Sequence, residues 1–166
     1  MASGFNKKGN VISDILLIVI IFFVFCITVF VGAKLSGDLN TEIQQDNLMN
    51  NESKELSNDL ATRYPSFMDG LIMFILILLW ILVLVASFQI DAHPIFFAVT
   101  IILFIFVMIV VVEIGNTFEE LTNDADLVEY RDQFPLTVWL FDNIIIVSLI
   151  FGASVMLVLY GKLRLG

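Results

Sequence analysis

The sequence contains few of the residues on which active sites depend. Among its 166 residues there is one cysteine, Cys26, and one histidine, His93. These two side chains supply neither a disulfide framework nor enough ligands for a zinc site. A Gly-rich phosphate loop, a nucleophile elbow and an HExxH motif are also absent, and the acidic residues lack the spacing of an EF-hand. The sequence therefore predicts no enzyme, no cofactor and no metal.

Charge is scarce as well, and most of it is of one sign. Charged residues make up 15% of the chain, against about a quarter in an ordinary soluble domain. Asp14, Glu113 and Asp142 lie near the ends of long apolar runs, and no ionisable residue lies in the middle of one. Transporters and channels place ionisable groups inside the hydrocarbon to bind or relay charge. A small channel or transporter is thus an alternative that the sequence disfavours.

Long apolar runs dominate what is present, since 59% of the residues are hydrophobic. A helix needs roughly 20 apolar residues to cross about 30 Å of hydrocarbon, where it satisfies its own backbone hydrogen bonds. Four blocks meet this requirement, at about residues 15–33, 71–90, 94–112 and 144–160. The sequence predicts an all-α integral membrane protein, a single membrane domain over residues 1–166, with the lipid bilayer as its first partner.

One connection between spans is very short. Only residues 91–93 separate the second span from Pro94, which predicts an antiparallel hairpin of the second and third helices. Asp91 and His93 could form a metal or pH-sensing pair, because histidine titrates near neutral pH. We expect instead that Asp91 caps the third helix and that His93 lies at the level of the lipid headgroups.

Three prolines mark the approaches to the later spans. Pro65, Pro94 and Pro135 each follow an aromatic-ring residue, and we expect each to open a helix. The first turn of a helix tolerates proline because the N–H that proline lacks has no partner there. Ser66 and Asp69 add a predicted cap at the start of the second span.

The long connections, residues 34–70 and 113–143, are acidic. In the first of them, four apolar residues recur at helical spacing with polar residues between: Leu39, Ile43, Leu56 and Leu60. This pattern predicts one or two amphipathic helices that lie on the membrane or on a partner. We therefore expect helical segments within the long acidic loops.

The acids are distributed unevenly across the membrane. With four spans, both long connections lie on one side, which then holds all seventeen acids except Asp14 and Asp91. The basic residues are densest in the two short tails, so the positive-inside rule places both termini in the cytoplasm or its topological equivalent. A one-sided acidic surface favours a basic partner. The predicted partner-contact residues are Asp38, Glu42, Asp46, Glu119, Glu120, Asp124, Asp126 and Glu129.

Trp80 lies midway along the second span, although tryptophan prefers the membrane surface. We expect it to pack between helices or against a neighbouring copy, which would make the protein a homo-oligomer. Serine and threonine within the spans are expected to bond to their own helix backbone rather than to a substrate.

Short motifs in about residues 64–164 resemble small multi-span proteins of viruses that carry a membrane beneath an icosahedral capsid. They are residues 88–97 (FQIDAHPIFF), 118–120 (FEE), 133–135 (QFP) and 160–162 (YGK). The resemblance implies a structural protein of the virion membrane whose acidic face meets capsid or accessory proteins, with no nucleic-acid contact. It would lie in the virion's internal membrane or in a host cell membrane. The alternatives are a holin-like lysis protein of a bacteriophage and an accessory subunit of a cellular membrane complex.

Overall fold

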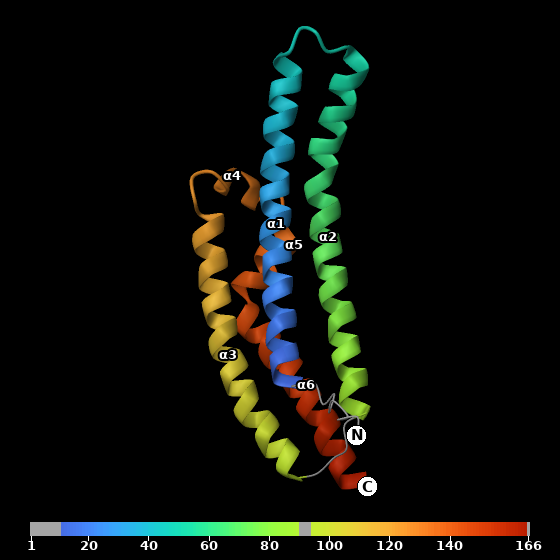
Figure 1. Cartoon of the computed structure of the whole chain (residues 1–166), viewed down its shortest axis with the longest axis vertical. Coiled ribbons are helices and arrows are strands. Elements are labelled where there is room, and N and C mark those ends of the chain that lie inside the picture. The colour runs from blue at the N-terminus through green and yellow to red at the C-terminus, as the bar shows by residue number, and fades with distance from the viewer. Residues whose placement is uncertain (1–10, 90–93, 166) are drawn as a thin grey trace, which may run out of the picture.

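The computed structural model describes residues 11–89 and 94–165, and every regular element within these ranges is a helix. The elements are α1 (Val11–Gln45), α2 (Asn51–Gln89), α3 (Pro94–Thr122), α4 (Val128–Arg131), α5 (Pro135–Asp142) and α6 (Ile144–Leu165) (Figure 1). Four of them, α1, α2, α3 and α6, are long and apolar enough to cross a membrane. The predicted all-helical class is confirmed, and the structure contains the four long apolar helices that the sequence predicts.

The first two helices are much longer than a membrane requires. α1 has 35 residues and α2 has 39. At about 1.5 Å per residue these helices are about 50 and 60 Å long, against about 30 Å of hydrocarbon. Figure 1 shows that the excess lies at the end where the two helices are joined, which rises beyond α3, α4 and α5. We name this extension, residues 38–60, the stalk.

The stalk differs from the separate amphipathic helices expected in the first long connection. α1 and α2 instead continue out of the spans without a break and meet in a short turn. Asp46 accepts a hydrogen bond from the Leu48 backbone N–H at 2.7 Å, and Asn50 accepts one from Ser53 at 2.8 Å. The first bond shapes the turn and the second caps α2. No glycine or proline interrupts residues 39–64, so the sequence offers no helix breaker within the stalk.

The three prolines take different positions. Pro94 is the first residue of α3 and Pro135 the first residue of α5. The expectation that Pro65 opens a helix is wrong, because Pro65 is buried within α2. A proline inside a helix costs about 3 kcal/mol, and here the packing of its neighbourhood against α1 offsets that cost. The predicted cap of Ser66 and Asp69 is wrong for the same reason, since both residues lie inside α2.

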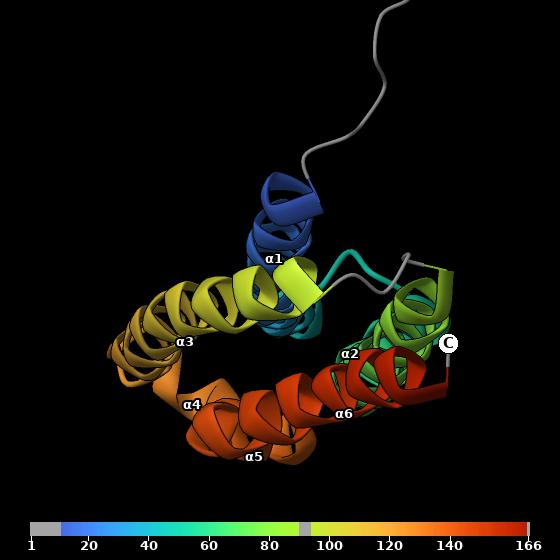
Figure 2. The ribbon, with the colours of Figure 1, turned by 90° about the horizontal axis from the view of Figure 1, so that it is seen from below.

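The helices pair differently from their order along the chain. α1 packs chiefly on α2, α2 also on α6, and α3 chiefly on α6; the end-on view in Figure 2 shows α2 beside α6. α2 and α3 run in opposite directions (Figure 1). The connection that would make them a hairpin, residues 90–93 with Asp91 and His93, lies outside the described residues.

A cluster of aromatic rings forms the best-packed part of the molecule. Phe30 of α1 stacks on Phe134 with ring centroids 4.3 Å apart and meets Phe118 of α3 edge-on at 5.3 Å. Phe118 in turn stacks on Phe141 of α5 at 3.8 Å. All four side chains are buried. We name them the aromatic core; it lies where α5 meets α1 and α3, and it joins the middle of α1 to α5 and to the end of α3.

The spans themselves bury little of their surface inside the molecule. The buried share of the most apolar stretch ranges from 22% in α1 to 6% in α3. Ile105, Phe106 and Ile109 of α3 and Leu157 of α6 are more than half exposed. In water such a surface would drive aggregation, whereas lipid covers it at no cost. The packing therefore supports the assignment of these helices to a bilayer.

Candidate functional site

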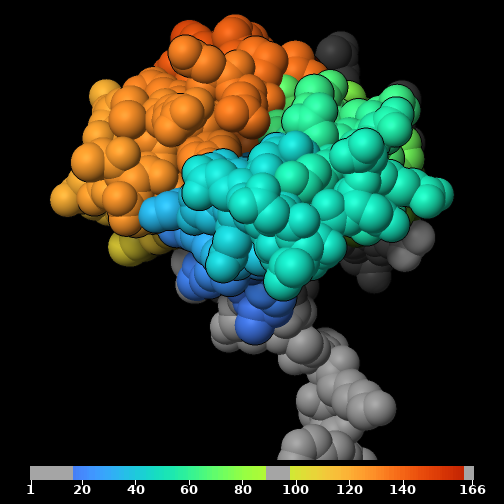
Figure 3. All heavy atoms as spheres, turned by 90° about the horizontal axis from the view of Figure 1, so that it is seen from above, coloured from blue at the N-terminus to red at the C-terminus, as the bar shows by residue number. Residues whose placement is uncertain are grey.

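The predicted partner-contact residues fall into two groups at one end of the molecule. The first group lies on the stalk half of α1, with Asp38 and Glu42, and in the turn that follows α1, with Asp46. The second lies at the end of α3, in the following turn and in α4: Glu119, Glu120, Asp124, Asp126 and Glu129. All are exposed except Asp46, which is half-buried. The view from above in Figure 3 shows the two segments side by side, so the fold brings both groups to a common face.

One of these acids is partly used within the protein. Asp126 forms an ion pair with Lys34 of α1, with 2.9 Å between the Lys34 Nζ and the carboxylate. This hydrogen bond, more than the neighbouring charges, raises the pKa of the Lys34 ammonium above its ordinary value. The pair ties the turn after α3 to the base of the stalk. Exposed pairs of this kind contribute about 0–1 kcal/mol, so Asp126 helps to place the turn without locking it.

The stalk has an apolar groove between its two helices. The groove encloses ≈ 260 Å³ and is lined by Ser36, Leu39, Ile43, Ser53, Leu56, Ser57 and Leu60. Leu39, Leu56 and Leu60 are 57%, 71% and 61% exposed, so their side chains are available for contact. We name this feature the stalk groove. The four apolar residues that suggested amphipathic helices all belong to it.

Acids border the stalk groove on both helices. Asp38 and Glu42 each precede a lining residue of α1, and Glu55 and Asp59 are the corresponding neighbours on α2. Asp59 is paired with Arg63 one turn away, and Lys54 donates to the backbone carbonyl of Gln44 across the stalk. The groove is thus an apolar strip with a mainly acidic margin.

A buried carboxylate joins α2 to α5, and sequence reasoning missed it. Asp69, only 3% exposed, accepts hydrogen bonds from the backbone N–H groups of Leu136 and Thr137 and from the Thr137 hydroxyl, at 2.7 to 2.9 Å. These are the free donors of the first turn of α5, whose own N-cap residue, Phe134, has no side-chain acceptor. Asp69 therefore caps a helix that lies 67 residues away in sequence, and no local signal identifies that partner.

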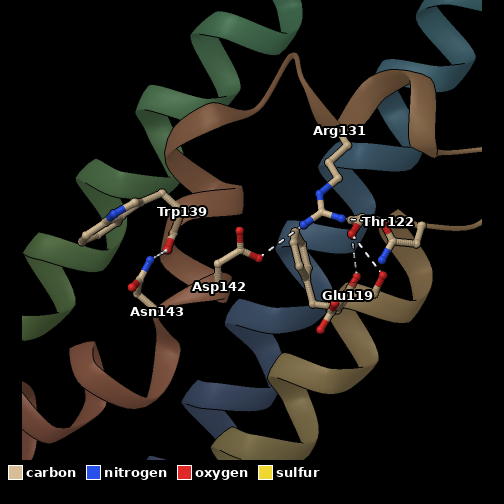
Figure 4. Close-up of polar contacts among 8 residues, drawn as sticks. Glu119, Thr122, Arg131, Trp139, Asp142 and Asn143 are labelled. Atoms are coloured by element: carbon tan, nitrogen blue, oxygen red, sulfur yellow. Dashed lines mark hydrogen bonds and ion pairs between the residues drawn. The ribbon is translucent and has the colours of Figure 1, made fainter.

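A second polar cluster lies around Arg131, at the end of α4. The guanidinium of Arg131 bonds to Asn123 and, at 3.4 Å, to Asp142 of α5 (Figure 4). Beneath it is a pocket of ≈ 410 Å³ between α3, α5 and the start of α6. Its polar wall includes Glu119, Arg131 and Asp142, and its apolar wall includes Val112, Ile144 and Ile145. We name it the interface pocket.

Polar groups within the spans are satisfied by the protein itself. Thr28 and Ser87 donate to backbone carbonyls one turn earlier in their own helices, as expected. The Trp80 indole N–H donates to Ser154 of α6 at 3.0 Å, and its ring stacks on Phe151. The interpretation that Trp80 packs between helices is confirmed.

Metal ligands do not gather in the described part of the chain, where no three His, Cys, Asp or Glu side chains are placed to hold an ion. The Asp91 and His93 pair lies outside that part. The predicted partner-contact residues are acids on the surface of the molecule.

Four apolar helices that bury little of their surface in one another define the chain as a multi-span integral membrane protein. Comparisons with protein families, with curated protein sequences and with solved structures find no match.

Proposed function

We propose that this chain is a structural membrane protein that anchors a helical stalk in the bilayer and binds partner proteins at its acidic end. The stalk is the observation that carries the proposal. α1 is about 20 Å and α2 about 30 Å longer than a membrane needs. A chain that served only to insert in lipid has no use for this length, and the stalk holds its apolar groove away from the headgroups.

The chemistry of the stalk groove indicates the kind of segment it binds. Leucine and isoleucine side chains four residues apart on each of two adjacent helices suit the apolar face of a third helix. The acidic margin, with Asp38, Glu42 and Glu55, favours a cationic segment, both for the contact and for the rate of encounter. A second copy of the stalk would bring the same acids together. We therefore propose a basic amphipathic helix of another protein as the occupant.

The acids around α4 extend the same surface. Glu119 and Glu120 lie at the end of α3 and Glu129 lies in α4, and Figure 3 shows these segments beside the stalk. A partner seated on the stalk groove would also pass over these groups. With the resemblance to capsid-associated membrane proteins, this favours a virion membrane, with the acidic end toward the capsid and the termini on the opposite side.

Cross-linking mass spectrometry of purified particles, or of native membranes, tests the proposal. Lys34 and Lys54, at the base and near the tip of the stalk, are the reactive positions. We expect cross-links from both lysines to basic segments of another protein. If the chain is absent from particles, and its expression alone makes a host membrane leaky, the lysis alternative replaces this proposal.

A matched pair of variants tests the stalk groove itself. The double variant Leu39→Ser with Leu56→Ser removes two exposed lining side chains, and Leu48→Ser changes the 95% exposed leucine of the turn, outside the groove. Burial of one leucine is worth about 1.5–3 kcal/mol, so the double variant should weaken partner binding by at least about tenfold. The Leu48 variant should bind as the parent does. Equal binding by both variants would exclude the groove.

A further inference from the structure

The interface pocket lies at the boundary between apolar and polar surface. On α3 its lining begins at Val112, the last residue of the apolar run, and reaches Glu119, two turns later. At about 1.5 Å per residue these positions are about 10 Å apart along the helix. Ile144 and Ile145, at the start of α6, line the apolar part, and Ile145 is 46% exposed. The pocket therefore changes from apolar to charged over the depth of a lipid headgroup.

The charges in the polar wall are mixed. The guanidinium of Arg131 carries five N–H donors, and within the described residues it bonds to Asn123 and Asp142. It therefore has donors left for a phosphate oxygen. The carboxylates of Glu119 and Asp142 border the same space. One cation and two anions give this wall an excess of one negative charge.

These features together select one class of ligand. An apolar floor with a charged upper wall fits a molecule with acyl chains and a polar head, and the volume is within the usual range for a small-molecule site, about 300–1,000 Å³. The excess negative charge disfavours a lipid with net negative charge. A primary ammonium can donate hydrogen bonds to both carboxylates, whereas a quaternary ammonium has no N–H to donate.

We propose that the interface pocket binds the headgroup of a zwitterionic phospholipid with a primary ammonium, of the phosphatidylethanolamine class. The ammonium lies between Glu119 and Asp142, the phosphate bonds to Arg131, and the acyl chains leave over Val112 and Ile145. The bound lipid fills the space between α3 and α6 where these helices leave the bilayer. This proposal is independent of what the stalk binds.

Native mass spectrometry of the full chain tests it, with three lipids of identical acyl chains at equal concentration. Ethanolamine, choline and glycerol headgroups are compared. We expect the ethanolamine lipid to be retained most and the anionic glycerol lipid least. Equal retention of the three lipids overturns the proposal. Water-soluble phosphoethanolamine should not displace the lipid; displacement at comparable concentrations would show that the pocket takes a free headgroup instead.

Adjacent acids on α3 provide a matched pair of variants. Glu119 lines the pocket, while Glu120 is an exposed acid next to it that does not. A hydrogen bond to a charged group is worth about 1.5–3 kcal/mol, so Glu119→Gln should weaken retention of the ethanolamine lipid by about tenfold or more. Glu120→Gln should leave retention unchanged. The same loss in both variants, or in neither, overturns the assignment. Both residues are exposed, so the fold should tolerate both changes.

Discussion

The stalk and the aromatic core share α1, yet they are held together by different forces. In the stalk, α1 and α2 meet through exposed polar contacts, such as the Gln44 amide to the Lys54 carbonyl at 2.8 Å and Asn40 to Asn58 at 3.4 Å. In the core, buried rings stack around Phe30 and a buried carboxylate, Asp69, bonds to α5. Water competes for every contact in the first region and for none in the second.

This difference indicates that the two regions have different roles in the protein. Buried contacts determine which helices are neighbours, because breaking them leaves cavities or unpaired polar groups. Exposed contacts leave the apolar side chains of the stalk free to bind something else. The buried core therefore sets the direction of the stalk. The apolar side chains of the stalk stay exposed, so their burial by a partner can still contribute free energy to binding.

The largest expected effect comes from removing the buried carboxylate. Asp69→Ala leaves three donors at the start of α5 without their acceptor, and each unsatisfied buried group costs about 1–3 kcal/mol. We expect a loss of about 3–5 kcal/mol in the free energy of unfolding, measured with denaturant in mixed micelles. The control is Asp59→Ala in the stalk, whose ion pair with Arg63 is exposed; it should change stability by less than about 0.5 kcal/mol. Comparable losses would erase the distinction between the two regions.

A smaller effect should mark the boundary between core and stalk. Gly37 lies on α1 where the hydroxyl end of Tyr130, from α4, leaves no room for a Cβ, while a Cβ at Gly70 of α2 would meet nothing within 4 Å. Gly70→Ala should stabilise its helix by up to about 1 kcal/mol. Gly37→Ala should cost about 1 kcal/mol, because overpacking outweighs the helical gain.

The measurement is the difference between the two glycine variants, about 2 kcal/mol in thermal or denaturant unfolding. If both variants are stabilised, Tyr130 moves aside easily and the packed region ends below Gly37.

The smallest effect is expected within the stalk itself. Asn58→Ala removes the contact to Asn40, which is exposed and 3.4 Å long, so stability should change by no more than about 0.5 kcal/mol. Hydrogen exchange should show that amides of the stalk open more readily than those near Phe30. Protection in the stalk equal to that in the core would contradict the comparison from which these predictions begin.

The sequence predicts the spans well and the connections poorly. Long uncharged runs must enter the hydrocarbon whatever their neighbours are, so the four helices follow from composition. Pro65 and Asp69 were misjudged because each was interpreted from adjacent residues alone. Proline next to an apolar run is typical of a helix start, but α2 had already begun at Asn51. Asp69 resembled a local cap, and its partners are in α5.

The candidate sites also differ in whether the sequence alone predicts them. The acids of the stalk and of the turn after α3 were found from charge alone, because their one-sided distribution requires only the order of the spans. The interface pocket was not found, since Arg131, Asp142 and Glu119 come from three elements, and their separation along the chain gives no sign of contact.

By itself the sequence decided that this protein belongs in lipid, because the free energy of transferring apolar side chains adds along the chain and needs no partner. It also decided that most of the negative charge would gather at one end. Only the tertiary structure decided that the first long connection extends the two helices as a stalk, and that a residue of α2 caps α5. Those outcomes depend on which surfaces pack against each other. A side chain is buried only when a second segment covers it, and the sequence of one segment does not specify that contact.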